Sequence, residues 1–130
     1  MLDASTFVLG LSARNRAAER WIENAYAGRV VAVAPGLVHA EVANALLVEH
    51  RVKGVPLYSA GFVLDRLLAF PLSVIPLDVL VADALTVAAS RELSVYDACY
   101  VALAEANDAV LVTADRKLAA ATNRAELILD

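Results

Sequence analysis

The sequence is poor in residues that form several common kinds of functional site. It contains one cysteine, Cys99, so an internal disulfide is excluded. Its two histidines, His39 and His50, have no partner at metal-ligand spacing, and no Ser-His-Asp or Cys-His arrangement is indicated. We therefore expect Cys99 to be a small buried residue and the histidines to be surface or packing residues.

Long uninterrupted apolar runs are also lacking. Arginines and acids break each long run before it reaches transmembrane length, so we expect no membrane span. The N-terminus reaches Asp3 without a charged region before an apolar core, so we expect no signal peptide and a cytoplasmic protein. With 60 % hydrophobic and 20 % charged residues in 130, the composition is typical of a compact single domain over residues 1–130.

The chain has no excess of basic residues. It carries 11 Lys and Arg against 15 Asp and Glu, for a net charge of −4. A nucleic-acid partner usually selects a basic surface. If four acids were gathered in one metal pocket, however, the remaining acids and bases would be equal in number. The charge therefore argues against tight non-specific binding of long duplexes but permits a polyanionic substrate.

Short apolar segments alternate with helical patterns along the chain. Residues 1–3 are very short for a strand, and residues 4–6 open an apolar segment at 7–11. Strands are predicted at 30–34, 72–75, 109–113 and 126–129, and helices at 14–26, 36–52, 59–69, 78–91, from Ser94 onward and at 115–121. The alternation predicts an α/β fold with a parallel sheet covered on both faces. A functional site then lies beyond the carboxyl ends of the strands.

The segment from Ser94 to Glu105 places a carboxylate on a helix face that we expect to be buried. Ser94 is a good N-cap, and Asp97 three residues later fits the capping-box pattern. Val101 and Ala104 share its stripe and are apolar, so an ionised Asp97 needs a cation, several donors or a metal. Taken alone, Asp97 is more simply a first-turn acid favoured by the helix dipole.

Three further acids occupy comparable positions. Asp3 ends the first strand, Asp115 follows Thr113 at the end of a later strand, and Glu41 shares an otherwise apolar helical stripe with Asn44. Singly, Asp3 and Asp115 have an ordinary explanation as helix caps, and Glu41 as a solvated residue. Together, four carboxylates cannot stay ionised in one pocket without cations. Such a set of oxygen ligands selects Mg²⁺ or Mn²⁺, which proteins use on phosphate esters.

Basic and apolar residues elsewhere in the chain indicate a function less clearly than the four acids do. Arg14, Arg16 and Arg20 fit a solvated helix face of alternating charge better than a phosphate-binding edge. We assign possible phosphate contacts instead to Arg116 and Lys117, which adjoin the proposed site. The apolar segment 55–70 fits a groove for a second copy or a partner, and equally a part of the core.

Four segments resemble the successive motifs of PIN domains, and the nearest likeness is to the VapC-type toxins of toxin–antitoxin pairs. They are Leu2–Ser5, Glu41–Leu46, Ser94–Ala104 and Leu111–Leu118, in the family's order and across essentially the whole chain. The Tyr-Asp-Ala-x-Tyr and Thr-x-Asp parts are the most specific. One departure is that relatives carry more β-branched residues before the first Asp, whereas only Met1 and Leu2 precede Asp3.

The resemblance implies a flavodoxin-like, three-layer α/β/α fold with a central parallel sheet of four to five short strands. It implies a metal-dependent endoribonuclease, the toxin of a toxin–antitoxin pair, which hydrolyses RNA phosphodiester bonds with water activated by Mg²⁺ or Mn²⁺. The implied partners are an RNA substrate, a small antitoxin that covers the site, and a second copy in a homodimer.

The resemblance also implies roles for particular residues. Asp3 and Asp97 are the implied principal metal ligands. Glu41 and Asp115 complete the catalytic acids, directly or through water. Ser5, Asn44 and Thr113 are implied to orient the carboxylates and water.

Other classes of protein remain as alternatives. A PIN-like module that only engages a partner protein would not need the complete acidic set. A receiver-type phospho-acceptor domain needs paired acids after its first strand and a lysine after its last, and Asp3 stands alone. A haloacid-dehalogenase-type phosphatase needs a second Asp where Ala4-Ser5 follows Asp3.

Overall fold

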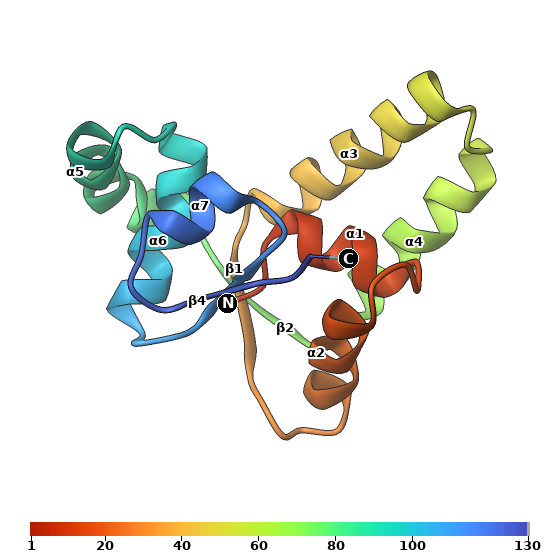
Figure 1. Ribbon diagram of the computed structural model, residues 1–130, viewed down its shortest axis with the longest axis horizontal. Helices are drawn as coiled ribbons and strands as arrows, with labels where there is room; N and C mark the ends of the chain where they lie inside the picture. The colour runs from red at the N-terminus through yellow and green to blue at the C-terminus, as the bar shows by residue number, and fades with distance from the viewer. Residues whose placement is uncertain (130) are drawn as a thin grey trace.

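The computed structural model describes residues 1–129 and has an α/β fold (Figure 1). The helices are α1 (Ala4–Leu11), α2 (Arg16–Tyr26), α3 (Val38–Lys53), α4 (Leu57–Ala69), α5 (Val81–Arg91), α6 (Val95–Ala106) and α7 (Arg116–Ala120). The strands are β1 (Ala32–Pro35), β2 (Leu72–Ile75), β3 (Leu111–Thr113) and β4 (Ala125–Leu127), and a 3₁₀ turn, η1, spans Leu77–Val79.

The strands form two parallel pairs. In the first, β1 lies beside β2 with Ala32 opposite Leu72. In the second, β3 lies beside β4 with Leu111 opposite Ala125. Each strand is three or four residues long, so neither pair could cover a core alone.

The first three residues join the two pairs into one sheet. The amide of Leu2 donates to Val33 O at 3.2 Å, and the amide of Asp3 donates to Val112 O at 3.3 Å. Leu2 and Val112 form a parallel bridge, and the amide of Val112 returns a bond to Met1 O at 2.9 Å. The order across the sheet is therefore β2, β1, residues 1–3, β3 and β4. The predicted central parallel sheet is present, with its middle member reduced to one bridge.

Helices cover the sheet on both sides. Figure 1 shows α5, α6 and α7 on one side and α1 and α2 on the other, while α3 and α4 form a hairpin that projects from this body. The residues of β3 are fully buried between the layers. The predicted three-layer α/β/α arrangement is confirmed.

Side-chain caps explain where several helices begin. The side chains of Asp3, Asn15, Ser94 and Asp115 each accept a hydrogen bond from a backbone amide in the first turn of α1, α2, α6 and α7. These bonds satisfy amides that have no partner within the helix. The sequence contains a capping residue at each of these positions, which is why the predicted starts of α6 and α7 agree with the structure to one residue.

The structure corrects three local predictions. The segment after Asp3 is a helix, α1, because the carboxylate of Asp3 caps it. The helix predicted at 78–91 is divided into η1 and α5, since the amide of Leu80 bonds back three residues to Leu77 O. The last strand is Ala125–Leu127 rather than 126–129, because it pairs only alongside the three residues of β3.

The buried apolar side chains form one cluster that draws on all of the layers. Phe7 from α1, Val42 from α3, Val101 from α6 and Val112 from β3 are each completely buried. Cys99 is 2 % exposed and unpaired, as expected for a small buried residue.

We expect substitution of Gly10 by alanine to destabilise the fold. A Cβ there would lie 2.8 Å from Ile22 Cγ1 and 3.1 Å from the carbonyl oxygen of Ala18, where α1 crosses α2. The backbone of α2 cannot move away cheaply, so Gly10→Ala should lower the free energy of unfolding by about 1–3 kcal/mol in urea denaturation.

Gly61→Ala is the matched control, because Gly61 is also helical and a Cβ there meets nothing within 4 Å. It should raise the free energy of unfolding by about 0.5–1 kcal/mol, through helix propensity alone. Equal effects of the two substitutions would contradict the close crossing of α1 and α2.

Candidate active site

The four predicted acids come from elements that meet at the carboxyl edge of the sheet. Asp3 caps α1, Asp115 caps α7, Asp97 lies in the first turn of α6, and Glu41 lies in the first turn of α3. The positive ends of these helices therefore point toward the carboxylates. The capping role that explains Asp3 and Asp115 singly is observed, and it holds both side chains at this edge.

Asp3 is the most rigidly held of the four acids. It is 5 % exposed, and its Oδ1 accepts from Ser5 Oγ at 2.7 Å and from the amide of Thr6 at 3.0 Å. Its Oδ2 accepts from Thr113 Oγ1 at 2.5 Å. Because a carboxylate oxygen has two lone pairs, Oδ2 keeps one without a donor in the described part of the chain.

Ser5 and Thr113 also connect Asp3 to the loop that carries Asp115. Ser5 Oγ accepts from the amide of Ala114 at 2.9 Å, and Thr113 Oγ1 accepts from the amide of Asp115 at 2.9 Å. The carboxylate of Asp115 in turn accepts from the amide of Lys117 at 2.9 Å. One chain of hydrogen bonds therefore sets the position of Asp3 relative to Asp115, the first and last of the four acids.

Glu41 is positioned by a buried tyrosine on a different helix. Tyr100, 1 % exposed on α6, donates its hydroxyl to Glu41 Oε1 at 2.6 Å. Burial raises the pKa of Glu41, the bond from Tyr100 opposes that rise, and the charges of Asp97 and Asp3 add to it. Burial and the bond to Glu41 raise the pKa of Tyr100, so its hydroxyl stays protonated as a donor.

Asp97 is half-buried and has charged neighbours of both signs. Burial raises its pKa first, and the charge of Asp115 raises it further. Lys117 and a hydrogen bond with Ser94 oppose the rise, while Asp3 adds a small increase. Burial therefore raises the pKa of both Asp97 and Glu41, and the charges of other carboxylates add to the rise.

The donor set fits a hard divalent cation bound partly through water. All four groups are carboxylates, which suit Mg²⁺ or Mn²⁺. Within residues 1–129, however, no three His, Cys, Asp or Glu side chains lie close enough together to hold a metal ion among them. The four acids therefore do not form one compact metal pocket in this part of the chain. A divalent cation here would be held by one or two carboxylates, with water as its other ligands. Asp3, with its free lone pair, and Asp97 are the residues that fit direct contact.

The structure changes the prediction for the Glu41 stripe. Asn44 was expected to share an apolar stripe with Glu41, but it is exposed. The reason is that α3 leaves the body of the protein with α4 as a hairpin, so its later turns meet solvent (Figure 1). Among residues 1–129, no hydrogen bond joins Asn44 to any of the four carboxylates.

Sequence reasoning missed two residues that hold the acids. Thr6 is completely buried, and its hydroxyl lies 3.0 Å from Asp3 Oδ1 and 2.8 Å from Val112 O. Its one proton serves one of these acceptors at a time. Thr6 directly follows the Leu2–Ser5 motif, and Tyr100 lies within the Ser94–Ala104 motif, but neither residue type indicated a contact with an acid.

The basic residues fall into two groups. Arg16 pairs with Glu23 at 3.7 Å on the predicted charged face of α2, whereas Arg14 lies in the loop before α2 and pairs with Glu49 of α3 at 2.9 Å. Arg116 and Lys117 are exposed on α7 and form no salt bridge within residues 1–129. They remain free to contact a phosphate next to Asp115.

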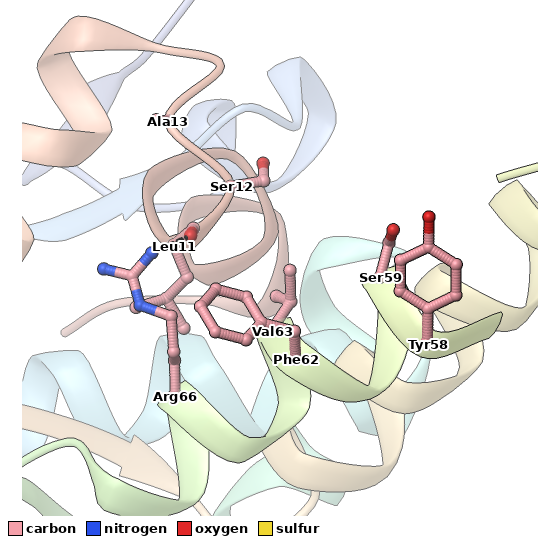
Figure 2. Close-up of a pocket in the computed structure, with 8 residues that line it drawn as sticks. All are labelled: Leu11, Ser12, Ala13, Tyr58, Ser59, Phe62, Val63 and Arg66. Atoms are coloured by element: carbon pink, nitrogen blue, oxygen red, sulfur yellow. Dashed lines mark hydrogen bonds between the residues drawn. The ribbon is translucent and has the colours of Figure 1, made fainter. Parts of the chain in front are cut away.

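A hollow of about 530 Å³ lies between α4 and the loop after α1, away from the four acids. Figure 2 shows Phe62 and Val63 at its centre, Tyr58 and Ser59 at one end, and Arg66 beside Leu11. Arg66 donates to the carbonyl oxygen of Leu11, and the rest of the lining is mainly apolar. With no carboxylate in its lining, this hollow does not provide the predicted chemistry.

Among residues 1–129, no helix combines the length and apolar character needed to cross a membrane.

Comparison with known proteins adds independent information. The chain matches the family model described as PIN domain over residues 1–123. It is similar to the crystal structure of PAE2754 from Pyrobaculum aerophilum, with 34% sequence identity and a TM-score of 0.72. That match covers 95% of this chain and 79% of the other. The comparison with curated proteins finds no match. Because the family model spans nearly the whole chain and the fold agrees, the protein belongs to the PIN domain family.

Proposed function

We propose that this protein is an Mg²⁺- or Mn²⁺-dependent endoribonuclease that hydrolyses RNA phosphodiester bonds. PIN domains are generally nucleases and generally use divalent metal ions. The observation that carries the proposal is the placement of the acids: hydrogen bonds from Ser5 and Thr113 hold Asp3 at the carboxyl edge of the sheet, and the hydroxyl of Tyr100 holds Glu41. Carboxylates that repel one another at the edge of a sheet form a site that a divalent cation stabilises.

Each residue has a separate task in this proposal. Asp3 and Asp97 hold the cation, and Glu41 and Asp115 contact it directly or orient its waters. A divalent ion in this place supplies a Lewis acid for the phosphate and lowers the pKa of a bound water. Thr113 and Ser5 keep the Asp3 carboxylate oriented, and Lys117 faces the incoming phosphate backbone.

We further propose that the protein is the toxin of a toxin–antitoxin pair, a cytoplasmic homodimer controlled by a small antitoxin. Exposed apolar side chains support the existence of protein partners. Tyr58 is 81 % exposed, and Leu57, Phe62 and Leu68 on the same helix are 62–64 % exposed. Apolar groups this exposed are typical of surfaces that another chain covers.

Replacement of Asp97 by asparagine should abolish cleavage while the fold remains intact. The substitution keeps the size of the side chain and removes the charge that holds the cation, a loss of several kcal/mol and more than about 100-fold in rate. The measurement is cleavage of total cellular RNA by the purified chain, with Mn²⁺, with Mg²⁺ and with EDTA. Asp83→Asn is the matched control, because Asp83 is an exposed acid in the first turn of α5.

Metal-dependent fragments from the wild type and Asp83→Asn, but not from Asp97→Asn, would support the proposal. Full activity of Asp97→Asn would refute it. An absence of both cleavage and Mn²⁺ binding in the wild type would favour the alternative, a PIN-domain module that only engages a partner protein.

The stability of the metal-free protein should depend on pH through Glu41. A carboxyl whose pKa is raised on folding contributes stability that is fully present below its ordinary pKa of 4.5 and is lost as pH rises through the raised value. Without divalent ions, the melting temperature of the wild type relative to Glu41→Gln should therefore fall between pH 4.5 and neutral pH. Mn²⁺ at neutral pH should reverse the fall.

Glu126→Gln provides the control for that measurement, because Glu126 is exposed on β4. Its melting temperature should follow that of the wild type at every pH. A wild type that follows Glu41→Gln instead would show that Glu41 does not repel its neighbours.

Tyr100→Phe should weaken Mn²⁺ binding by acting through Glu41. Residues that orient metal-binding carboxylates typically change metal affinity by about 10–100-fold. Calorimetric titration of the wild type, Tyr100→Phe, Glu41→Gln and the double variant measures the effect. If Tyr100 only positions Glu41, then Tyr100→Phe should have little further effect in the Glu41→Gln background. Additive losses would indicate a general structural role, and Tyr58→Phe should change nothing.

A further inference from the structure

A hollow of about 310 Å³ opens directly beside Glu41. It is lined from α3 by Leu37, Ala40, Glu41, Asn44 and Ala45 and from α6 by Tyr96. The α3 residues recur every three or four positions, so they form one face of that helix. The volume is at the small end of the range of about 300–1,000 Å³ in which proteins hold small ligands, so it suits a part of a larger substrate.

The lining combines three properties in a small space. Tyr96 is an aromatic side chain that remains 68 % exposed although it immediately precedes the half-buried Asp97. Asn44 is exposed, and its side-chain amide carries both a hydrogen-bond donor and an acceptor. Within residues 1–129, neither forms a hydrogen bond with the four carboxylates. Leu37 gives an apolar floor. An exposed ring, an amide and an apolar floor are what proteins use to hold an unstacked nucleobase.

The hollow adjoins two of the proposed catalytic acids. Glu41 is part of its lining, and Tyr96 immediately precedes Asp97 on α6. An RNA backbone that is held at the acids would therefore bring a neighbouring nucleotide to the hollow.

We infer that this hollow is a subsite for one unstacked base of a single-stranded RNA, on which Tyr96 stacks and whose edge Asn44 contacts. The inference deepens the proposed nuclease function and rests on it for the position of the cleaved phosphate. A base in a duplex is covered on both faces by its neighbours, so the ring of Tyr96 cannot stack on it.

The test is direct binding of labelled RNA decamers to the full chain. The probes are rA₁₀, rU₁₀ and rC₁₀ as single strands and the rA₁₀·rU₁₀ duplex, read by fluorescence anisotropy in Ca²⁺. This ion neutralises carboxylates but does not impose the octahedral geometry of Mg²⁺, so binding is read separately from cleavage. The proteins are the wild type, Tyr96→Ala, Tyr96→Phe, Asn44→Ala and Tyr58→Ala, the last changing a more exposed tyrosine outside the hollow.

Tyr96→Ala should weaken binding of the single strands about 5- to 100-fold, the effect of losing one base–aromatic stack. Tyr96→Phe keeps the ring and should stay within about twofold of the wild type, and Tyr58→Ala should have no effect. Asn44→Ala should reduce the differences in affinity among the three single strands. The duplex should bind more weakly and show no dependence on Tyr96.

Unchanged binding by Tyr96→Ala would overturn the inference, and so would equal losses in Tyr96→Ala and Tyr58→Ala. A loss in Tyr96→Phe as large as in Tyr96→Ala would also overturn it, since it would assign the contact to the hydroxyl rather than to the ring. If RNA binding depends on Tyr96 but Mn²⁺ gives no cleavage, the subsite stands and the proposed nuclease fails. If cleavage occurs and is independent of Tyr96, the nuclease stands and the subsite fails.

Discussion

The placement of Asp3 is the constraint on which the rest of the structure depends. Its amide bonds to Val112 in the three-residue segment that joins the two halves of the sheet, while its side chain caps α1 and accepts from Thr113. A single residue therefore serves the sheet, a helix and the acidic site. Since Asp3 is almost completely buried, any shift in the sheet would move a carboxylate of the site with it. This explains how such short strands can hold a site with defined geometry.

Two different kinds of contact position Asp115 and Glu41 relative to Asp3. Asp115 is linked to Asp3 through the hydroxyl of Thr113, over a few covalent bonds of one loop. Glu41 depends on a contact between helices, the bond from Tyr100, and its helix continues into the projecting hairpin (Figure 1). The site is thus fixed at Asp3 and Asp115 by bonds around one loop, and at Glu41 by a contact between helices. The hollow that we assign to a nucleobase lies beside Glu41.

Sequence reasoning could find the parts of this arrangement that are encoded locally. Capping residues such as Ser94 and Asp115 marked the helix starts, and the apolar run at 72–75 marked β2 to the residue. The contact between Glu41 and Tyr100 joins residues 59 positions apart, so no local pattern could reveal it. The exposure of Asn44 was also beyond reach, because it follows from the direction in which the α3–α4 hairpin leaves the body of the protein.

The single thiol of the chain has a consequence for how motions near the site can be observed. Cys99 lies on α6 between Asp97 and Tyr100, and burial together with the charge of Glu41 raises its pKa. A thiol that is buried and protonated reacts slowly with alkylating reagents, because the thiolate is the reactive form. Its rate of labelling therefore reports how often α6 separates from its neighbours. Labelling of Cys99 would therefore measure local opening of α6 within the same helical turn as Asp97, a proposed metal ligand.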